Sequence, residues 1–142
     1  MTDIDSPVTI LGTDKAWDLL AGQRLGRLAV RSDVGLDIFP INYAVDGESL
    51  VFRTAEGTKL ASLIAYGLVT FEIDSWTEES GYSVIIKGQA APITDPGEIA
   101  QAEALKLRPW VPTVKTIFVR IVVTEISARK FNFGLDPIEK YR

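Results

Sequence analysis

The chain has 142 residues, of which 46% are hydrophobic, and it carries a formal net charge of −4. This length fits a single domain, residues 1–142, with an ample core. The acidic balance argues against nucleic acid as the main partner, because that binding needs a basic face. No run approaches the roughly 20 apolar residues that span a bilayer, and the acidic first residues are unlike a secretory signal. We therefore expect a cytoplasmic protein that acts away from membranes.

Histidine and cysteine are both absent. Their absence excludes Ser-His-Asp and Cys-His nucleophilic sites, thiolate redox chemistry, and zinc sites built from either residue. Magnesium or calcium held by carboxylates alone stays open, but no acidic run has the EF-hand pattern, and we predict no metal ligands. If the protein is an enzyme, a borrowed cofactor carries its chemistry.

The first predicted element is a helix over residues 14–21. Thr13 is a suitable N-cap, apolar side chains recur along the run, and Gly22 ends it. A strand over residues 25–31 follows, in which apolar side chains point to one face and arginines to the other. A short helix is therefore expected before the first strand.

A strictly alternating apolar pattern over residues 36–45 predicts the next strand. Pro40 lies inside this run, and because proline cannot donate to a sheet ladder, the strand needs an unpaired side or a bulge there. The Asp-Gly pair at residues 46–47 predicts a hairpin turn. The returning strand covers residues 50–54.

That returning strand runs into a predicted helix, and the junction carries two cations and two hydroxyls: Arg53, Thr54, Thr58 and Lys59. A helix start presents unpaired N–H groups and the positive end of the helix dipole, so it is a ready site for an anion. The added arginine and lysine make the junction a candidate phosphate clamp. The alternative is an ordinary helix start with a solvated lysine.

The rest of the chain predicts three more strands and two helices. The helix after Gly57 ends at Gly67, strands are expected over 69–73, 82–91 and 116–126, and a helix capped by Asp95 ends near Leu107. Residues 109–112 read Pro-Trp-Val-Pro, which is a stiff extended connector. Six strands with hairpin signals between neighbours favour an antiparallel barrel over a parallel sheet.

Five segments carry a family resemblance. They read GRLAV at 26–30, FPINY at 39–43, FRTAEGTKL at 52–60, FEID at 71–74 and GYSVIIKG at 81–88. In order and spacing they resemble the pyridoxamine 5′-phosphate oxidase-like, FMN-binding split-barrel family, in its small actinobacterial-type branch, from about residue 25 to residue 129. The resemblance implies a mainly β fold, a six-stranded antiparallel Greek-key split barrel with short flanking helices. It also implies a homodimer with one FMN in each of two clefts at the subunit interface.

The same resemblance implies roles for the residues of the junction. Arg53 and Thr54 would face the phosphate and the flavin ring from the strand. Thr58 and Lys59 would bind the phosphate at the helix start, in agreement with the anion site argued from the residues themselves.

The resemblance also implies three residues that lie beside the flavin ring. Pro40, Ile41 and Asn42 match the strand whose backbone passes beside the isoalloxazine ring, where main-chain groups can recognise the ring edges. The alternatives are a simple edge-strand proline for Pro40 and a solvated polar side chain for Asn42.

Three more positions are candidates of the same kind, each with an open alternative. Trp110 would cover the flavin from the partner subunit, or it anchors the end of the barrel. Ser83 points either to a ligand or to water. Arg129 lies near where the family places a basic residue close to the cleft, or it is solvated.

The chain departs from the family on the substrate side. Enzymes that oxidise pyridoxamine phosphate carry an Arg-x-His element near the C-terminus, whereas residues 127–131 read SARKF here and no histidine exists. We therefore do not expect a true pyridoxamine phosphate oxidase. The missing histidine also disfavours haem, although tyrosine ligation stays open.

Four functions remain open from the sequence. The first is an FMN-dependent oxidoreductase with an unassigned small-molecule substrate, and the second is a non-enzymatic flavin-binding or carrier protein. The third is a deazaflavin (F420)-dependent reductase, whose longer cofactor needs a larger basic groove. Arg27, Arg31, Lys87 and Arg120 can line such a groove, but as alternating strand residues they are more typical of a solvated face. The fourth is an interaction protein that binds no small ligand.

Overall fold

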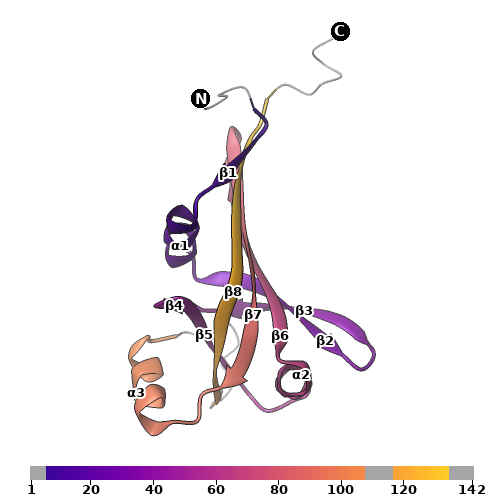
Figure 1. Cartoon of the computed structure of the whole chain (residues 1–142), viewed down its shortest axis with the longest axis vertical. Helices are drawn as coiled ribbons and strands as arrows, with labels where there is room; N and C mark the ends of the chain where they lie inside the picture. The colour runs from indigo at the N-terminus through magenta and orange to yellow at the C-terminus, as the bar shows by residue number, and fades with distance from the viewer. Residues whose placement is uncertain (1–5, 108–116, 135–142) are drawn as a thin grey trace.

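The computed structural model describes residues 6–107 and 117–134, with the side chain of Thr58 left out (Figure 1). The strands are β1 (Val8–Leu11), β2 (Leu25–Ser32), β3 (Gly35–Asn42), β4 (Ala44–Asp46), β5 (Ser49–Thr54), β6 (Leu68–Trp76), β7 (Ser80–Pro92) and β8 (Ile117–Asn132). The helices are α1 (Thr13–Ala21), α2 (Thr58–Tyr66) and α3 (Pro96–Ala104). Among these residues no helix is both long and apolar enough to cross a membrane.

All the strands join one antiparallel sheet. Its order is β3-β2-β6-β7-β8-β5-β4, and β1 pairs with the far end of β8. The sheet curls around a core, so the protein has the mainly β, split-barrel architecture that the sequence predicts. Figure 1 shows β8 running along the length of the molecule, with the β2–β3 hairpin projecting away from that axis. Five of the six predicted strands form as single strands, the predicted strand over residues 36–45 is divided into β3 and β4, and the short strand β1 is an addition that the sequence analysis missed.

The predicted continuous strand over residues 36–45 is wrong, because the chain leaves the ladder at Tyr43. The Tyr43 N–H donates to the Arg24 carbonyl at 3.0 Å, and its hydroxyl donates to the Leu20 carbonyl at 2.6 Å. Its ring meets the Phe71 ring edge-on, with centroids 4.9 Å apart. These contacts draw the buried tyrosine towards α1 and divide the run into β3 and β4.

The helix starts agree with the sequence in one case and differ in another. Asp95 caps α3, since its carboxylate accepts the Glu98 N–H at 3.0 Å. The predicted Thr13 cap is wrong: Gly12 is the N-cap of α1, with extended backbone and no side-chain cap, so Thr13 is already the first helical residue. Gly67 ends α2 as predicted, with a positive φ of 72° that suits glycine.

The core has two parts, one on each side of β5. Leu50 and Phe52 point into the main cluster, which α1 and α2 close, whereas Val51 points to a second cluster with Phe118 and α3. Because both faces of β5 are covered, all three residues are fully buried rather than alternating in exposure. This two-sided burial makes β5 a rigid base for the residues at its end.

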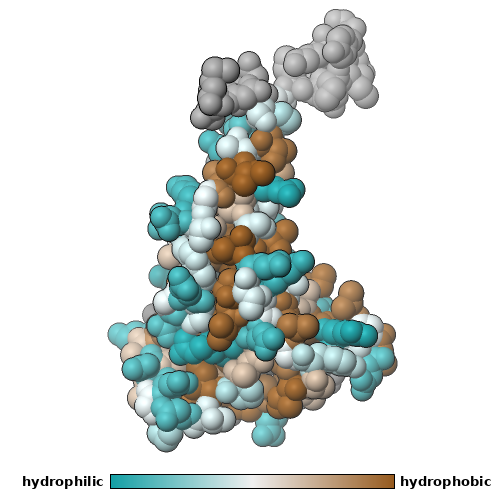
Figure 2. All heavy atoms as spheres, viewed as in Figure 1, coloured by the Kyte–Doolittle hydropathy of each residue, from teal (hydrophilic) through white to brown (hydrophobic). Residues whose placement is uncertain are grey.

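The sheet has an outer face, which we define as the side turned away from the main cluster. Along β3, β2, β6 and β7 its residues alternate with core residues, so Ile38 and Ile85 belong to it. Ile38 is 69% exposed and Ile85 is 41% exposed. Hydrophobic side chains reach the surface along the molecule and over the β2–β3 hairpin (Figure 2).

Candidate functional site

The first turn of α2 lacks the acidic residues that mark the other helix starts, and Glu56 precedes it in the exposed loop after β5. No side chain caps the start of α2, and its first turn holds no acidic residue. The first turns of α1 and α3 instead contain Asp14 and Glu98, respectively. The first N–H groups of α2 therefore face no competing carboxylate from their own turn, which is the arrangement that suits an anion.

Lys59 lies against two aromatic rings beside this helix start. Its ammonium nitrogen is 4.8 Å from the centroid of the Phe39 ring and 5.9 Å from that of Phe52. These contacts attract a cation to the face of each ring. Phe39 precedes Pro40 on β3, so Lys59 contacts the predicted ring-binding strand, on the face opposite to the Pro40 and Asn42 side chains.

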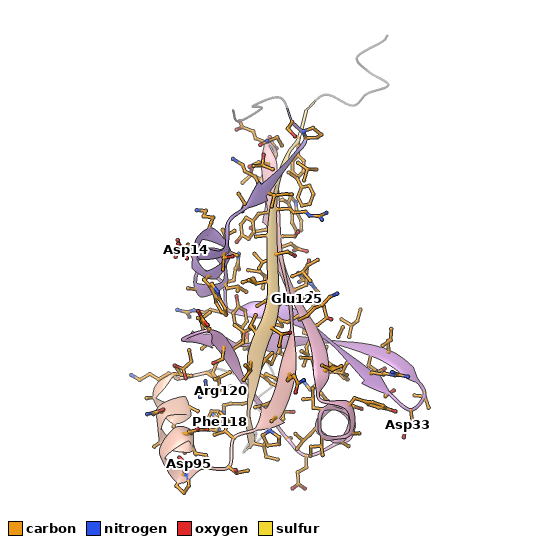
Figure 3. All side chains as sticks on the ribbon, in the orientation of Figure 1. Asp14, Asp33, Asp95, Phe118, Arg120 and Glu125 are labelled. Atoms are coloured by element: carbon orange, nitrogen blue, oxygen red, sulfur yellow. The ribbon has the colours of Figure 1, made fainter. Side chains whose placement is uncertain are left out.

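Arg53 lies on the opposite side of β5. Its guanidinium carbon is 5.0 Å from the centroid of the Phe118 ring, on the strand that pairs with β5. Figure 3 shows Phe118 and Arg120 on the lower part of β8, near α3. Because Phe52 and Arg53 are consecutive in a strand, their side chains leave from opposite faces. The two cations therefore approach the end of β5 from its two sides.

Of the two threonines at the junction, the structure describes the side chain of Thr54 but not that of Thr58. Thr54 is 4% exposed, and its hydroxyl donates to the Ala55 carbonyl at 3.2 Å. That hydroxyl is therefore already used as a donor within the loop, although its oxygen can still accept. Thr58 is the first residue of α2, but its side chain lies outside the described part of the chain.

The edge strand carries Pro40 as the sequence predicts. β3 pairs with β2 alone among the described strands, and Pro40 sits opposite Arg27. Pro40 is exposed and Asn42 is half-buried on the outer face, whereas Ile41 is 6% exposed in the core. Of Ile41, only the backbone is therefore accessible to a ligand on the outer face.

A cavity of about 730 Å³ opens beside Asn42. Two cations, Arg24 and Lys106, belong to its lining, which contains no acidic residue. α3 ends at Ala104, earlier than predicted. Lys106, two residues later, has a left-handed φ of 53°, and the chain turns towards the cavity there. The sequence analysis missed both cations because they lie in loops without a motif. Trp110 lies outside the described residues.

Ser83 and Arg129 form a separate group. They face one another across β7 and β8 on the outer face. Three strand steps separate β7 from β3 in the sheet order. Arg129 also lies about 35 Å along β8 from Phe118, given the roughly 3.3 Å rise per strand residue. Within one protomer, the structure therefore does not bring this pair to the clamp.

The four cations proposed for a basic groove each have a partner. Arg27 pairs with Glu72 and, at 3.1 Å, with Asp74. The other three pairings are Lys87 with Glu125 at 4.0 Å, Arg120 with Asp46 at 2.9 Å, and Arg31 over the Tyr66 ring at 5.3 Å. These four residues therefore do not form the unpaired basic groove that the F420 alternative needs.

The Arg27 cluster also changes the acidity of one carboxyl. Burial raises the pKa of the Glu72 carboxyl, and its hydrogen bond with Asp74 adds to the rise. The Arg27 ion pair opposes both effects. When both carboxyls are ionised, the two carboxylates around one guanidinium give the middle of the outer face a small net negative charge.

Most of the chain is similar to known proteins. Residues 12–130 match the family model for pyridoxamine 5′-phosphate oxidase. Over 93 residues the chain is 42% identical to the uncharacterized protein Rv3129 of Mycobacterium tuberculosis, covering 66% of this chain and 84% of that protein.

Two solved structures have the same fold. A candidate pyridoxamine 5′-phosphate oxidase from Corynebacterium glutamicum superposes with a TM-score of 0.81 at 38% identity, covering 93% of this chain and 99% of that one. The FAD binding protein from Mycobacterium smegmatis superposes with a TM-score of 0.77 at 42% identity, covering 89% and 100% of the two chains.

Proposed function

The chain belongs to the pyridoxamine 5′-phosphate oxidase family, and on that premise we propose that it is a flavoprotein that binds FMN at the β5–α2 junction. One observation carries the proposal: Lys59, in a first turn of α2 without acidic residues, is packed on Phe39 next to Pro40 in the edge strand. A phosphate site and a strand with free edge groups thereby lie next to each other, which matches the two ends of a flavin mononucleotide.

The residues at the junction fit that cofactor chemically. A phosphate dianion needs charged donors and N–H groups, which Arg53, Lys59 and the first turn of α2 can supply. The backbone around Ile41 can pair with the amide-like edge of the ring because β3 has an unpaired side. The cavity beside Asn42, at about 730 Å³, falls within the usual size range of ligand pockets.

We further propose that the working unit is a homodimer with the cofactor between subunits. Ser83 and Arg129 lie too far from the clamp of their own protomer to complete it, so the clamp of a second copy is their proposed target. The outer face supports such a contact, because Ile10 is 80% exposed and Ile38 is 69% exposed there. Exposed isoleucines of this kind gain stability when a second surface covers them.

For the reaction, we propose an oxidoreductase with an unassigned small-molecule substrate. Bound FMN supplies hydride transfer, while the chain holds the phosphate, orients the ring and excludes water. The family's Arg-x-His substrate element is missing, so pyridoxamine phosphate is not the proposed substrate. A flavin carrier without turnover is the alternative, and the test is NADH or NADPH oxidation above that of free FMN.

FAD is a second candidate cofactor, favoured by the likeness to the 42% identical FAD binding protein from M. smegmatis. FMN and FAD share the ring and the phosphate on the ribityl chain, so the same clamp serves both. The deazaflavin F420 is less favoured because the cations proposed for its groove are paired within the chain.

The experiment is an absorbance spectrum of the purified protein before and after incubation with FMN or FAD and desalting. Retained flavin bands, with FMN held in stoichiometric amount, are the expected result. Retention of FAD in preference to FMN would select the second candidate. If neither flavin is retained at high concentration, the proposed function is wrong.

A further inference from the structure

A second groove lies between α1 and the hairpin of β6 and β7, which we call the α1 groove. Its volume is about 340 Å³, and its main walls are Leu11, Lys15, Leu19, Trp76, Tyr82 and Lys130. It shares no lining residue with the larger cavity beside Asn42. We propose that the α1 groove binds a small organic anion with a flat, apolar body, such as an aryl carboxylate or sulfonate.

The apolar part of the groove is built on a well-held hairpin. Trp76 ends β6 and is 73% exposed. The turn that follows is closed by the Thr77 N–H, which donates to the Ser80 carbonyl at 2.7 Å. The Thr77 hydroxyl oxygen also accepts the N–H groups of Glu79 and Ser80 at 3.3 Å. Trp76 pairs with Gly81 at the end of β6, so its Cβ leaves the face of the sheet opposite to that of Tyr82, and Trp76 borders the groove at the end of this strand.

The Tyr82 ring forms an aromatic wall of the groove and is held in place. The Gln23 side-chain amide donates to the Tyr82 hydroxyl at 2.8 Å, which holds the end of that ring. Leu11 and Leu19 pack partly against the main core and add apolar surface to the groove beside this ring. An aromatic body entering the groove would thus replace water on preformed walls, which lowers the entropic cost of binding.

The charge of the groove specifies an anion. Lys130 sits directly opposite Tyr82 across β7 and β8, so both side chains lie on the side that faces α1. Lys15 comes from the first turn of α1. Neither lysine forms an ion pair with any described residue, and no acidic residue lines the groove. Two positive groups gathered above apolar walls, in a chain of net charge −4, match a ligand with an anionic end.

The size of the groove limits the ligand to about three fused or linked rings. A volume of about 340 Å³ is near the lower end of the range for ligand pockets, roughly 300–1,000 Å³. A dinucleotide such as FAD exceeds it. The groove is therefore proposed as a site additional to the flavin site, and it does not depend on the flavin assignment.

The test uses 1-anilinonaphthalene-8-sulfonate as the probe and its uncharged parent, N-phenyl-1-naphthylamine, as the matched ligand. The wild-type protein is expected to bind the sulfonate at one site, with a rise in probe fluorescence. The Lys15→Gln/Lys130→Gln variant should bind it roughly tenfold more weakly and bind the uncharged parent within about twofold of wild type, because exposed charge contacts contribute modestly. Leu11→Ala should weaken both probes, since it removes part of an apolar wall.

Lys87→Gln is the control, because Lys87 lies outside the groove and is likewise exposed. A urea unfolding midpoint equal to that of the wild type shows that the Lys15→Gln/Lys130→Gln variant is folded. Unchanged sulfonate binding in that variant, or an equal loss in Lys87→Gln, would overturn the proposal. So would a parallel loss of FMN, which would make the groove part of the flavin site.

Discussion

The ammonium nitrogen of Lys59 lies 4.8 Å from the centroid of the Phe39 ring, so a cation at the start of α2 is held against the edge strand. Arg53 is held in a similar way on Phe118, at 5.0 Å. Each cation is therefore oriented by an aromatic face before any anion arrives. This orientation reduces the side-chain freedom that binding would otherwise remove.

Replacing Lys59 with alanine should weaken FMN binding. Loss of a charge-assisted contact to the phosphate is expected to cost about 1.5–3 kcal/mol, or at least roughly tenfold in Kd. Quenching of flavin fluorescence on titration gives the Kd. Lys87→Ala serves as the control because Lys87 pairs with Glu125 away from the junction. An unchanged Kd in Lys59→Ala would mean that the phosphate clamp is misplaced.

Replacing Phe39 with leucine should reduce FMN affinity while leaving the fold intact. Leucine keeps an apolar side chain but removes the ring face, which contributes about 0.5–1 kcal/mol to holding an ammonium group. We expect a Kd increase of roughly two- to fivefold, measured by the same titration. The double variant with Lys59→Ala should show no additional loss, since both changes act through one contact. Fully additive losses would contradict the orienting role.

Replacing Ile38 with glutamate should dissociate the proposed homodimer. A charge in a covered apolar contact is costly, whereas Val34→Glu at the tip of the β2–β3 hairpin should have little effect because Val34 is already 94% exposed. Sedimentation velocity distinguishes the two states, and flavin retention should fall together with dimerisation. A wild-type protein that sediments as a monomer with bound flavin would rule out the interface site.

Replacing Gly26 with alanine should destabilise the fold. An added Cβ would collide with the Phe71 ring and lie 2.9 Å from the Glu72 carbonyl oxygen, so the packed strands must shift. Overpacking of this kind costs about 1–3 kcal/mol. Urea unfolding measures it, with Gly134→Ala as the control because a Cβ there meets nothing within 4 Å. Equal stability of the two variants would contradict the close approach of β2 and β6.

The Glu72 carboxyl should titrate above its ordinary pKa in the folded protein, because burial and Asp74 outweigh Arg27. Since folding raises this pKa, the unfolded chain releases the proton at lower pH than the folded chain. The contribution of Glu72 to stability therefore falls as pH rises from the ordinary pKa through the raised one. NMR titration of the carboxyl carbon measures the pKa directly. Asp74→Asn should lower it and Arg27→Gln should raise it, and the opposite signs would contradict the cluster.

Local sequence patterns determined much of this protein. Alternation of apolar residues predicted the strands over 25–31 and 82–91, and the Asp-Gly pair predicted the turn at 46–47, because these signals act between close neighbours in the chain. The cations at the β5–α2 junction were also visible, since a strand end and a helix start are adjacent in sequence. The missing histidine excluded whole classes of site before any fold was known.

Tertiary structure alone decided the rest. β1 is too short to predict, and it forms because Val8 finds its partner Phe131 at the other end of the chain. The break at Tyr43 likewise depends on Leu20, which belongs to another element. Arg27 reads as a solvated cation until β6 places Glu72 beside it. Such features depend on which strands become neighbours, and that is decided by burial of the whole core rather than by any local pattern.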